Sequence, residues 1–292
     1  MTQPTIDFPL HENHSHSQIV RRIPRYAQVL ELGCGDGSMS RLMREACKAH
    51  IIGVDHNPDI VWKAQRFCDY VFTEDLDDPN SLDSLEGEKF DVITLVDVLE
   101  HLKYPEKLLK RLKPLLLDEG RLLLSVPNVA HASVRLELLN GGFEYEQAGI
   151  LDNTHLKFFT LKSIQTLLAS VGYKVHEVDY TWHDLPDEVI AHYLQTAGLE
   201  VTPQALETFH APEAVAYQFI ISASPESLEE NKTVIPLAIK PIDASWQTWG
   251  RINTELAMAQ AELERVYSTR SWKMLRRGAT VWRNIQSRFT LG

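Results

Sequence analysis

The chain has 292 residues and a formal net charge of −11, with 44% hydrophobic and 24% charged residues. These values are typical of soluble globular proteins, and they exclude a wholly disordered chain, a collagen-like chain and a disulfide scaffold. No apolar run approaches the roughly 20 residues of a membrane-spanning helix, and the first residues do not resemble a signal peptide. The three cysteines, Cys34, Cys47 and Cys68, lack C-x-x-C spacing, which predicts a reducing, cytoplasmic compartment and no structural zinc.

Charge is unevenly distributed along the chain. Residues 265–292 contain seven basic and no acidic residues, whereas residues 1–264 contain 22 basic and 40 acidic residues, a net charge of −18. This asymmetry predicts an acidic catalytic body with a basic tail suited to an anionic surface. The acidic body argues against tight binding of long nucleic acids, which requires a basic footprint.

Apolar runs alternate with helical patterns from residue 28 to about residue 175. The runs predicted as strands cover residues 28–32, 51–54, 70–73, 90–95, 121–126, 174–180 and 216–223. The helices predicted between them cover residues 38–50, 58–67, 105–117 and 161–171, with two more at about 186–209. This alternation predicts an α/β fold whose parallel strands are covered by helices on both faces.

The pattern divides the chain into four regions. We predict an N-terminal arm at 1–24, a domain at 25–225 with a helical insert at about 181–212, a linker at 226–244 and a helical tail at 245–292. The arm contains His11, His14 and His16, which we interpret as part of a mobile polar segment rather than a metal site.

A glycine-rich turn follows the first predicted strand, in the sequence VLELGCGDG at residues 29–37. Glycine lets the backbone turn sharply and lets a ligand approach main-chain atoms. A nucleotide-type ligand then lies at the carboxyl ends of the strands, where the strand order switches. The dinucleotide-binding pattern G-x-G-x-x-G would need a glycine at Ser38. Asp55 ends the second strand, where its carboxylate is placed to bind two ribose hydroxyls, and the acidic step Glu74-Asp75-Leu76 follows the third.

This set of residues resembles the class I S-adenosylmethionine-dependent methyltransferases over about residues 25–225. The resemblance implies a Rossmann-like, seven-stranded, mostly parallel sheet with its last strand antiparallel, and S-adenosylmethionine as cofactor. It also implies the following contacts: Gly33, Gly35 and Gly37 approach the methionine and ribose portion, Glu31 braces that loop, Asp55 takes the ribose hydroxyls, Asp75 with Leu76 meets the adenine, and Val96 and Asp97 flank the sulfonium end.

Two later segments are candidates for the acceptor side, PNVAH at residues 127–131 and GILDNTHLKFFT at residues 149–160. The second resembles a subgroup encoded with surface-polysaccharide and sugar-modifying enzymes, and also ubiquinone-pathway O-methyltransferases. His155 is the first candidate for general base, with Asp152 as its orienting acid, because a histidine near its usual pKa accepts a proton at neutral pH. The alternative is that His155 caps the following helix or packs a loop. His131 is a second candidate base, or else a solvent-exposed loop histidine.

A metal site competes for the same histidine. The sequence DVLEH at residues 97–101, together with His155, resembles the metal site of small-RNA 3′-end 2′-O-methyltransferases. Asp97, Glu100, His101 and His155 would then hold a divalent ion that binds two sugar oxygens and lowers a hydroxyl pKa. The chain departs from that family by having aspartate at the first position and no second histidine beside His155. We therefore expect no metal in the site.

The tail has an apolar stripe flanked by Arg and Lys. The stripe consists of Trp272, Leu275, Ala279, Trp282, Ile285 and Phe289. It predicts docking on an anionic membrane surface or self-association and packing through residues 265–289, with nucleic-acid binding as a third alternative.

Together these features predict a cytoplasmic S-adenosylmethionine-dependent O-methyltransferase, peripheral on the membrane. The expected acceptor is a sugar hydroxyl of a glycan, glycolipid or nucleotide-sugar precursor. The alternatives are an isoprenoid-phenol (quinone-type) O-methyltransferase, a metal-dependent RNA 2′-O-methyltransferase, and a non-catalytic module that keeps the cofactor fold.

Overall fold

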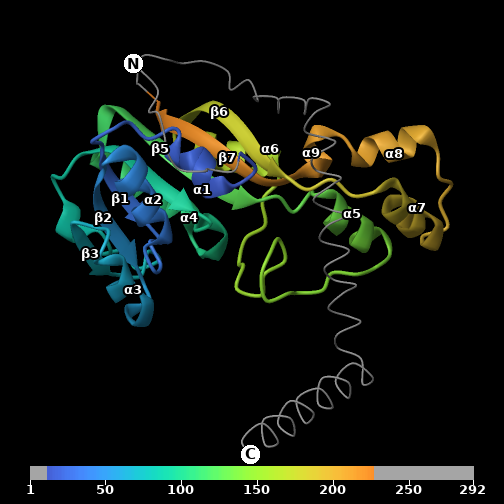
Figure 1. Ribbon diagram of the computed structural model, residues 1–292, viewed down its shortest axis with the longest axis horizontal. Coiled ribbons are helices and arrows are strands. Elements are labelled where there is room, and N and C mark those ends of the chain that lie inside the picture. The colour runs from blue at the N-terminus through green and yellow to red at the C-terminus, as the bar shows by residue number, and fades with distance from the viewer. Residues whose placement is uncertain (1–11, 227–292) are drawn as a thin grey trace, which may run out of the picture. The chain divides into compact units, whose positions relative to one another are not determined.

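The computed structural model describes residues 12–226 of the chain (Figure 1). The tail at 245–292, with its stripe, lies outside the described residues. So do the linker from residue 227 onwards and residues 1–11 of the expected arm, including His11.

Seven strands form one sheet. They are β1 (Gln28–Leu32), β2 (His50–Asp55), β3 (Tyr70–Thr73), β4 (Phe90–Val96), β5 (Leu116–Pro127), β6 (Tyr173–Trp182) and β7 (Ala216–Pro225). Their order across the sheet is β3-β2-β1-β4-β5-β7-β6. Strands β1 to β5 pair in parallel, and β7 is antiparallel to both of its neighbours, β5 and β6. The predicted seven-stranded sheet with an antiparallel last strand is confirmed.

Helices lie on both sides of this sheet and at one end of it (Figure 1). They are α1 (Ser15–Val20), α2 (Ser38–Cys47), α3 (Pro58–Ala64), α4 (Pro105–Leu112), α5 (Ala132–Leu139), α6 (Leu161–Ser170), α7 (Asp187–Thr196), α8 (Pro203–Phe209) and α9 (Pro212–Val215). Three short 3₁₀ turns are η1 (Asp83–Leu85), η2 (Leu99–His101) and η3 (Lys113–Leu115). The insert expected at about 181–212 holds α7 and α8, whereas α1, α5 and α9 were not predicted. No helix among residues 12–226 is long and apolar enough to cross a bilayer.

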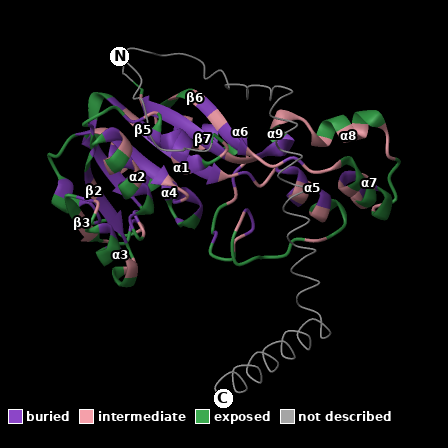
Figure 2. Ribbon diagram, in the orientation of Figure 1, coloured by how far each residue is buried: buried purple, intermediate pink, exposed green. Residues whose placement is uncertain are grey.

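The core lies in the central strands. In β1 every residue after Gln28 is buried, and β4 and β5 bury most of theirs (Figure 2). Parallel strands covered on both faces are apolar throughout rather than alternating, which explains the continuous apolar runs in the sequence. The helix expected at 105–117 ends at Leu112, because the Lys113-Pro114-Leu115 turn is 3₁₀ and β5 begins directly after it. Pro114 has no backbone N–H to donate to the carbonyl of Lys110, so the α-helical hydrogen bonding stops there.

The N-terminal segment differs from the expected arm. Residues 15–20 form α1, and the side chains of Ile19, Val20 and Ile23 are buried in the core. Asn13 pairs with the backbone of Trp182 in β6: its Nδ2 donates to the carbonyl at 2.9 Å, and its Oδ1 accepts from the N–H at 2.7 Å. A short apolar pattern thus joins the described part of the arm to the domain.

The parallel topology brings the ends of β1 to β5 to one edge of the sheet. The glycine-rich turn follows β1, Asp55 ends β2, Asp75 follows β3, Asp97 follows β4, and residues 128–131 follow β5. This edge is where ligands bind in open α/β sheets.

Candidate active site

The three glycines of the turn all have positive φ, but they serve two different purposes. A Cβ on Gly33 (φ +76°) would lie 2.5 Å from Cγ2 of Val98, and one on Gly37 (φ +84°) 2.7 Å from Cα of Ala64. A Cβ on Gly35 (φ +52°) would meet no other residue's atoms within 4 Å. Gly33 and Gly37 are therefore required for close packing. Gly35 leaves an open main-chain surface that a ligand can approach.

Asp55 is tied to this turn by backbone hydrogen bonds. Its carboxyl oxygens accept the N–H of Gly35 (Oδ2, 2.9 Å) and the N–H of Asn57 (Oδ1, 2.9 Å). The residue is only 8% exposed. Each carboxylate oxygen has a further lone pair, so the side chain is oriented and still able to accept hydroxyls. This arrangement fits the ribose-binding role implied for Asp55.

Glu31 lies beneath the turn. It is buried, and its carboxyl accepts a hydrogen bond from Oγ of Ser40 in α2, so the contact joins β1 to α2 on either side of the turn. Burial raises the pKa of Glu31 to about 8, so the side chain is largely protonated at neutral pH.

The residues expected near the adenine follow β3. Oδ1 of the exposed Asp75 accepts the N–H of Asp77 at 2.9 Å, and Leu76 is buried. The Glu74 carboxylate accepts the N–H of Leu82 at 2.7 Å. These bonds fix the loop while the Asp75 side chain faces solvent at its rim.

Val96 ends β4, and Asp97 follows it. Val96 is half-buried, and Asp97 has φ +56°, which is uncommon for a residue with a side chain. Oδ1 of Asp97 accepts from Oγ of Ser125 at 2.8 Å and from Nε2 of Gln218. The N–H of Asp97 donates to Oγ of Ser125 at 3.1 Å. Side chains from β5 and β7 therefore hold Asp97, and these two partners were not predicted because they are distant in sequence.

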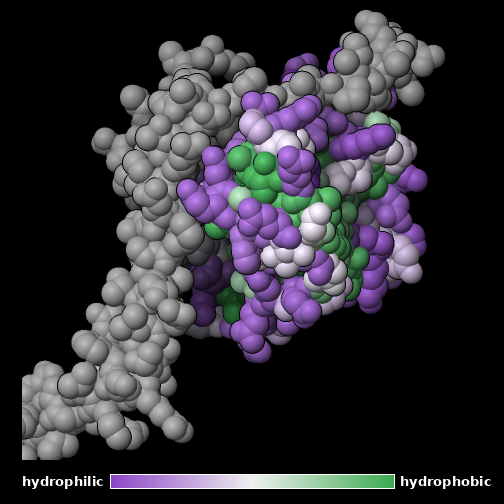
Figure 3. Space-filling model, turned by 90° about the vertical axis from the view of Figure 1, so that its right-hand side faces the viewer, coloured by the Kyte–Doolittle hydropathy of each residue, from purple (hydrophilic) through white to green (hydrophobic). Residues whose placement is uncertain are grey.

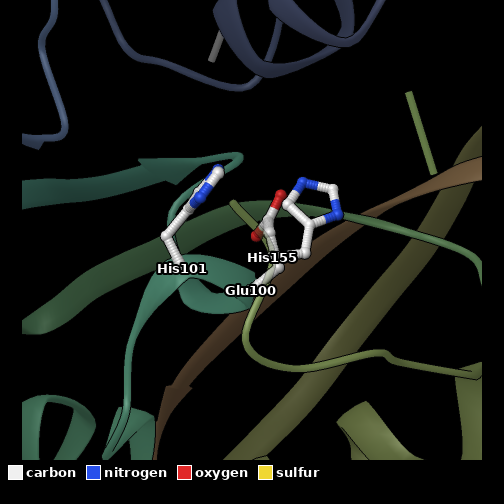
Figure 4. A group of neighbouring side chains, drawn as sticks. All are labelled: Glu100, His101 and His155. Atoms are coloured by element: carbon white, nitrogen blue, oxygen red, sulfur yellow. The ribbon is translucent and has the colours of Figure 1, made fainter. Parts of the chain in front are cut away.

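The next turn brings three chemically active side chains together (Figure 4). One ligand atom from each of Glu100, His101 and His155 lies within 4.8 Å of the others. Glu100 is 1% exposed, and in the described part of the chain neither of its carboxyl oxygens has a hydrogen-bond partner. Burial, followed by the charge of Asp97, raises its pKa well above the usual value. Such an unpartnered buried carboxyl is rare and calls for a proton, a cation or a ligand.

Backbone contacts explain why these residues meet. The carbonyl of Glu100 accepts the N–H groups of Leu156 (2.7 Å) and Lys157 (2.9 Å), which draws the segment around His155 onto η2. Nδ1 of His155 lies 3.0 Å from the carbonyl of Ile150. Because a carbonyl can only accept, Nδ1 carries a proton, and the neutral imidazole then has its lone pair on Nε2. The contact with Ile150 thus selects the tautomer of His155 in which Nε2 can accept a proton.

Asp152 lies on the same turn as His155, whose backbone N–H donates to the Asp152 carbonyl at 3.0 Å. Oδ1 of Asp152 accepts from the N–H (2.8 Å) and the hydroxyl (2.5 Å) of Thr154, and these bonds lower the pKa of Asp152. Its carboxylate thus holds Thr154, while the acid that lies with the His155 ring in the cluster is Glu100. The orienting role expected for Asp152 stays a prediction.

His131 has a structural position. It is buried, its Nε2 lies 2.7 Å from the carbonyl of His183, and its Nδ1 accepts the N–H of Ser133 at the start of α5. Burial lowers its pKa to about 4. With both ring nitrogens engaged, His131 is neither a base for an acceptor nor a solvent-exposed loop residue.

The cluster also has the donor set of a divalent-cation site. Glu100, His101 and His155 offer one carboxylate and two imidazoles, a set that suits a first-row metal. An ion held there would act as a Lewis acid on an acceptor oxygen. Asp97, the fourth residue of the expected metal set, is engaged with Ser125 and Gln218 and lies outside the cluster.

Comparison with known proteins agrees with this architecture. A family model described as "Methyltransferase domain" matches residues 13–178. Among curated relatives, a ubiquinone biosynthesis O-methyltransferase of Actinobacillus pleuropneumoniae is 30% identical over 135 residues, covering 44% of this chain and 56% of that protein. A second, from Xanthomonas axonopodis pv. citri, is 28% identical over 161 residues, covering 53% and 66%. The chain thus spans between about half and two thirds of these relatives.

Solved structures show the same fold. A SAM-dependent methyltransferase from Archaeoglobus fulgidus aligns with a TM-score of 0.52 and 20% identity, covering 71% of this chain and 91% of that one. A chain from the complex between the Haloferax volcanii Trm112 methyltransferase activator and a methyltransferase aligns with a TM-score of 0.50 and 15% identity, covering 75% and 91%. With its family match over more than half its length, the chain belongs to the methyltransferase-domain family and has the fold of the S-adenosylmethionine-dependent methyltransferases.

Proposed function

We propose that the protein transfers the methyl group of S-adenosylmethionine to a sugar hydroxyl of a glycan, glycolipid or nucleotide-sugar precursor. The observation that supports O-methylation is the buried base at the carboxyl edge of the sheet, His155, whose Nε2 has a free lone pair beside the unpartnered Glu100 carboxyl. A sugar hydroxyl is a weak nucleophile, so its methylation benefits from such a base. The likeness of residues 149–160 to sugar-modifying methyltransferases supports the sugar.

In this mechanism the protein aligns the acceptor and removes its proton. S-adenosylmethionine supplies an activated methyl group on its sulfonium. The backbone at Gly35 and the carboxylate of Asp55 would hold the cofactor, and Nε2 of His155 would accept the hydroxyl proton. As the oxygen–methyl bond forms, the sulfur–methyl bond breaks and S-adenosylhomocysteine leaves. An imidazolium at His155 favours the ionised form of Glu100, so the two charges stabilise each other. General-base catalysis of this kind contributes about 10²- to 10⁴-fold in rate.

The test is methyl transfer from labelled S-adenosylmethionine into an extract of the source cells, separated into saccharide, lipid-phenol and RNA fractions. We expect label in the saccharide fraction. His155→Ala should lower the rate at least 100-fold with cofactor affinity unchanged, whereas His192→Ala, at an exposed position on α7, should have no effect. Label in another fraction, or full activity of His155→Ala, would overturn the proposal.

An isoprenoid-phenol acceptor is the second candidate, favoured by the curated relatives, which are named ubiquinone biosynthesis O-methyltransferases. It predicts label in the lipid-phenol fraction. An RNA acceptor with a divalent ion is the third, favoured by the Glu100–His101–His155 cluster. It predicts label in RNA that disappears with a chelator and returns with added Mn²⁺. A non-catalytic module predicts no label and a biological effect that survives Asp55→Ala.

A further inference from the structure

Exposed apolar side chains are concentrated in the chain segment that leads to His155. Five large hydrophobic residues within 19 positions are more than a third exposed: Leu138, Leu139, Phe143, Tyr145 and Leu156. On the end of the molecule that carries α5, α7 and α8, hydrophobic groups interrupt a largely hydrophilic surface (Figure 3). Exposed apolar groups concentrated beside a catalytic residue are typical of a ligand-binding surface.

Three aromatic rings of this region contact one another and reach His155. The ring centroids of Phe143 lie 5.7 Å from those of both Tyr145 and Phe158, in edge-to-face orientation. Phe158 lies 6.2 Å from the ring of His155, also edge to face. Such geometry is favourable for aromatic pairs. The rings therefore form a continuous surface that ends at the catalytic base.

The loop that carries these rings is held in place. The N–H of Glu146 donates to the carbonyl of Leu151, and the N–H of Asn153 donates to the carbonyl of Glu146, both at 2.9 Å. Ile150 and Leu151 are buried in a small cluster with Val134 of α5. The aromatic surface is thus preorganised by the folded chain, which lowers the entropy cost of binding.

The surface is also acidic. Residues 138–158 contain three acidic residues, Glu144, Glu146 and Asp152, and one basic residue, Lys157. Glu144 and Glu146 are exposed and alternate with the aromatic residues along the chain. Burial raises the pKa of nearby Glu137, and so do the charges of Glu146 and Glu144, in agreement with their gathering at one place. Like charges repel an anionic ligand, whereas carboxylates accept hydrogen bonds from uncharged hydroxyls.

We propose that Phe143, Tyr145 and Phe158, with the carboxylates of Glu144 and Glu146, form an acceptor wall that binds an uncharged pyranose ring and disfavours a nucleotide sugar. The apolar face of the sugar ring lies on the aromatic surface, and its hydroxyls donate to the carboxylates. This inference rests on the proposed sugar methylation and narrows it, because it selects a neutral saccharide among the three acceptor forms. An isoprenoid chain would have no partner for the two carboxylates.

Binding can be measured without turnover. The experiment is saturation-transfer NMR of the full chain with S-adenosylhomocysteine, using maltotriose as the uncharged pyranose probe and UDP-glucose as the charged one. We expect saturation of the maltotriose ring protons at least fivefold stronger than that of the glucose ring of UDP-glucose. Tyr145→Ala should reduce the maltotriose signal at least fivefold, whereas Tyr70→Ala, an equally exposed tyrosine on β3, should leave it unchanged. The paired substitution Glu144→Lys and Glu146→Lys should raise the UDP-glucose signal.

Several results would overturn the acceptor wall. They are no maltotriose signal in the wild type, an equal or stronger UDP-glucose signal, or an unchanged maltotriose signal in Tyr145→Ala. If Tyr145→Ala loses the maltotriose signal but still binds S-adenosylhomocysteine, misfolding is excluded as the cause of the loss. The proposed methyl transfer can be refuted independently of the acceptor wall. If no saccharide is labelled but maltotriose binding depends on Tyr145, the acceptor wall is a saccharide-binding site and the proposed reaction is wrong.

Discussion

The cofactor side and the acceptor side of the sheet edge treat their buried carboxyl groups in opposite ways. Both oxygens of Asp55 accept backbone N–H groups, from Gly35 and Asn57. Glu100, which is more deeply buried, has no hydrogen-bond partner for either oxygen among the described residues. The difference in hydrogen bonding does not follow from charge, since both are acids near the carboxyl end of a strand: Asp55 ends β2, and Glu100 lies in η2, which follows β4.

This contrast shows where folding completes a site and where it does not. On the cofactor side the chain itself fixes the charge and orientation of the carboxylate, so that the cofactor meets a finished surface. On the acceptor side the buried carboxyl stays incomplete until a proton, a cation or a substrate arrives, and this costs stability. We therefore expect cations and ligands to change the stability of the protein mainly through the acceptor side.

The largest expected effect is on the pH dependence of stability and comes from Glu31, the buried acid of the cofactor side whose pKa is raised to about 8. An acid whose pKa is raised by folding keeps its proton in the native state, so the free energy of unfolding falls as pH rises from about 4.5 to about 8. Relative to Glu31→Gln, wild-type stability should fall by about 1.4 kcal/mol per pH unit in this window, or about 5 kcal/mol in total. Urea unfolding of both proteins at pH 5 and pH 8 checks this. Equal pH dependence of the two proteins would show that Glu31 ionises normally in the fold.

Asp55→Ala should produce the next largest effect. It removes a charged acceptor of two backbone hydrogen bonds and the expected partner of the ribose hydroxyls. We expect the affinity for S-adenosylhomocysteine to fall about 100-fold, since hydrogen bonds to charged groups contribute about 1.5–3 kcal/mol. Isothermal titration calorimetry measures it, with Asp59→Ala on the exposed side of α3 as the matched control. A loss below threefold would place the ribose elsewhere.

Glu100→Leu tests the opposite side of the comparison. Replacing an unpartnered buried carboxyl by an apolar group of similar size should raise the free energy of unfolding by about 1–3 kcal/mol. The same change should lower the rate of methyl transfer, because His155 loses its acid neighbour. Stability and activity are thus expected to move in opposite directions. A destabilised variant would mean that the Glu100 carboxyl is already satisfied in solution.

Sequence reasoning placed the glycine-rich turn and Asp55 at the sheet edge where the structure has them, but it did not predict the acid that lies beside His155. The glycine-rich turn and Asp55 are each signalled by the residues directly around them, because a strand end and a turn are local features. The acid beside His155 is not local in sequence, since Glu100 lies 55 positions earlier. Hydrogen bonds from the N–H groups of Leu156 and Lys157 to the carbonyl of Glu100 bring the two segments together. Asp152, three residues away, was the acid that local sequence indicated, and its orienting role stays a prediction.

Tertiary contacts also decided the other differences. Gln218 reaches Asp97 from a strand more than a hundred residues later, which no local pattern could indicate. Helix α1 was hidden because its polar residues outnumber the few apolar ones, Ile19 and Val20, that pack in the core. Local composition therefore predicted the strands better than it predicted which loops and ends the strands bring together.

The smallest effect is expected at the helical insert, where His210 lies between two carboxylates. Its Nδ1 is 2.6 Å from Asp184 and its Nε2 is 2.6 Å from Asp187, and these contacts raise its pKa. A base whose pKa is raised by folding adds stability that is fully present below its unfolded pKa of 6.5 and is lost as pH rises through the folded value. Because Asp187 is half-exposed, we expect this contribution to the free energy of unfolding to be less than about 1 kcal/mol.

Hydrogen exchange should then show faster opening of α7 and α8 at pH 8.5 than at pH 6, after correction for the intrinsic exchange rate. His210→Gln should remove that difference without altering exchange in β1 and β4, because the insert is separate from the cofactor side. If hydrogen exchange in β1 and β4 changed as much as in α7 and α8, the helical insert and the central strands would open as one unit. The cofactor side and the acceptor side would then differ in their hydrogen bonding but not in their dynamics.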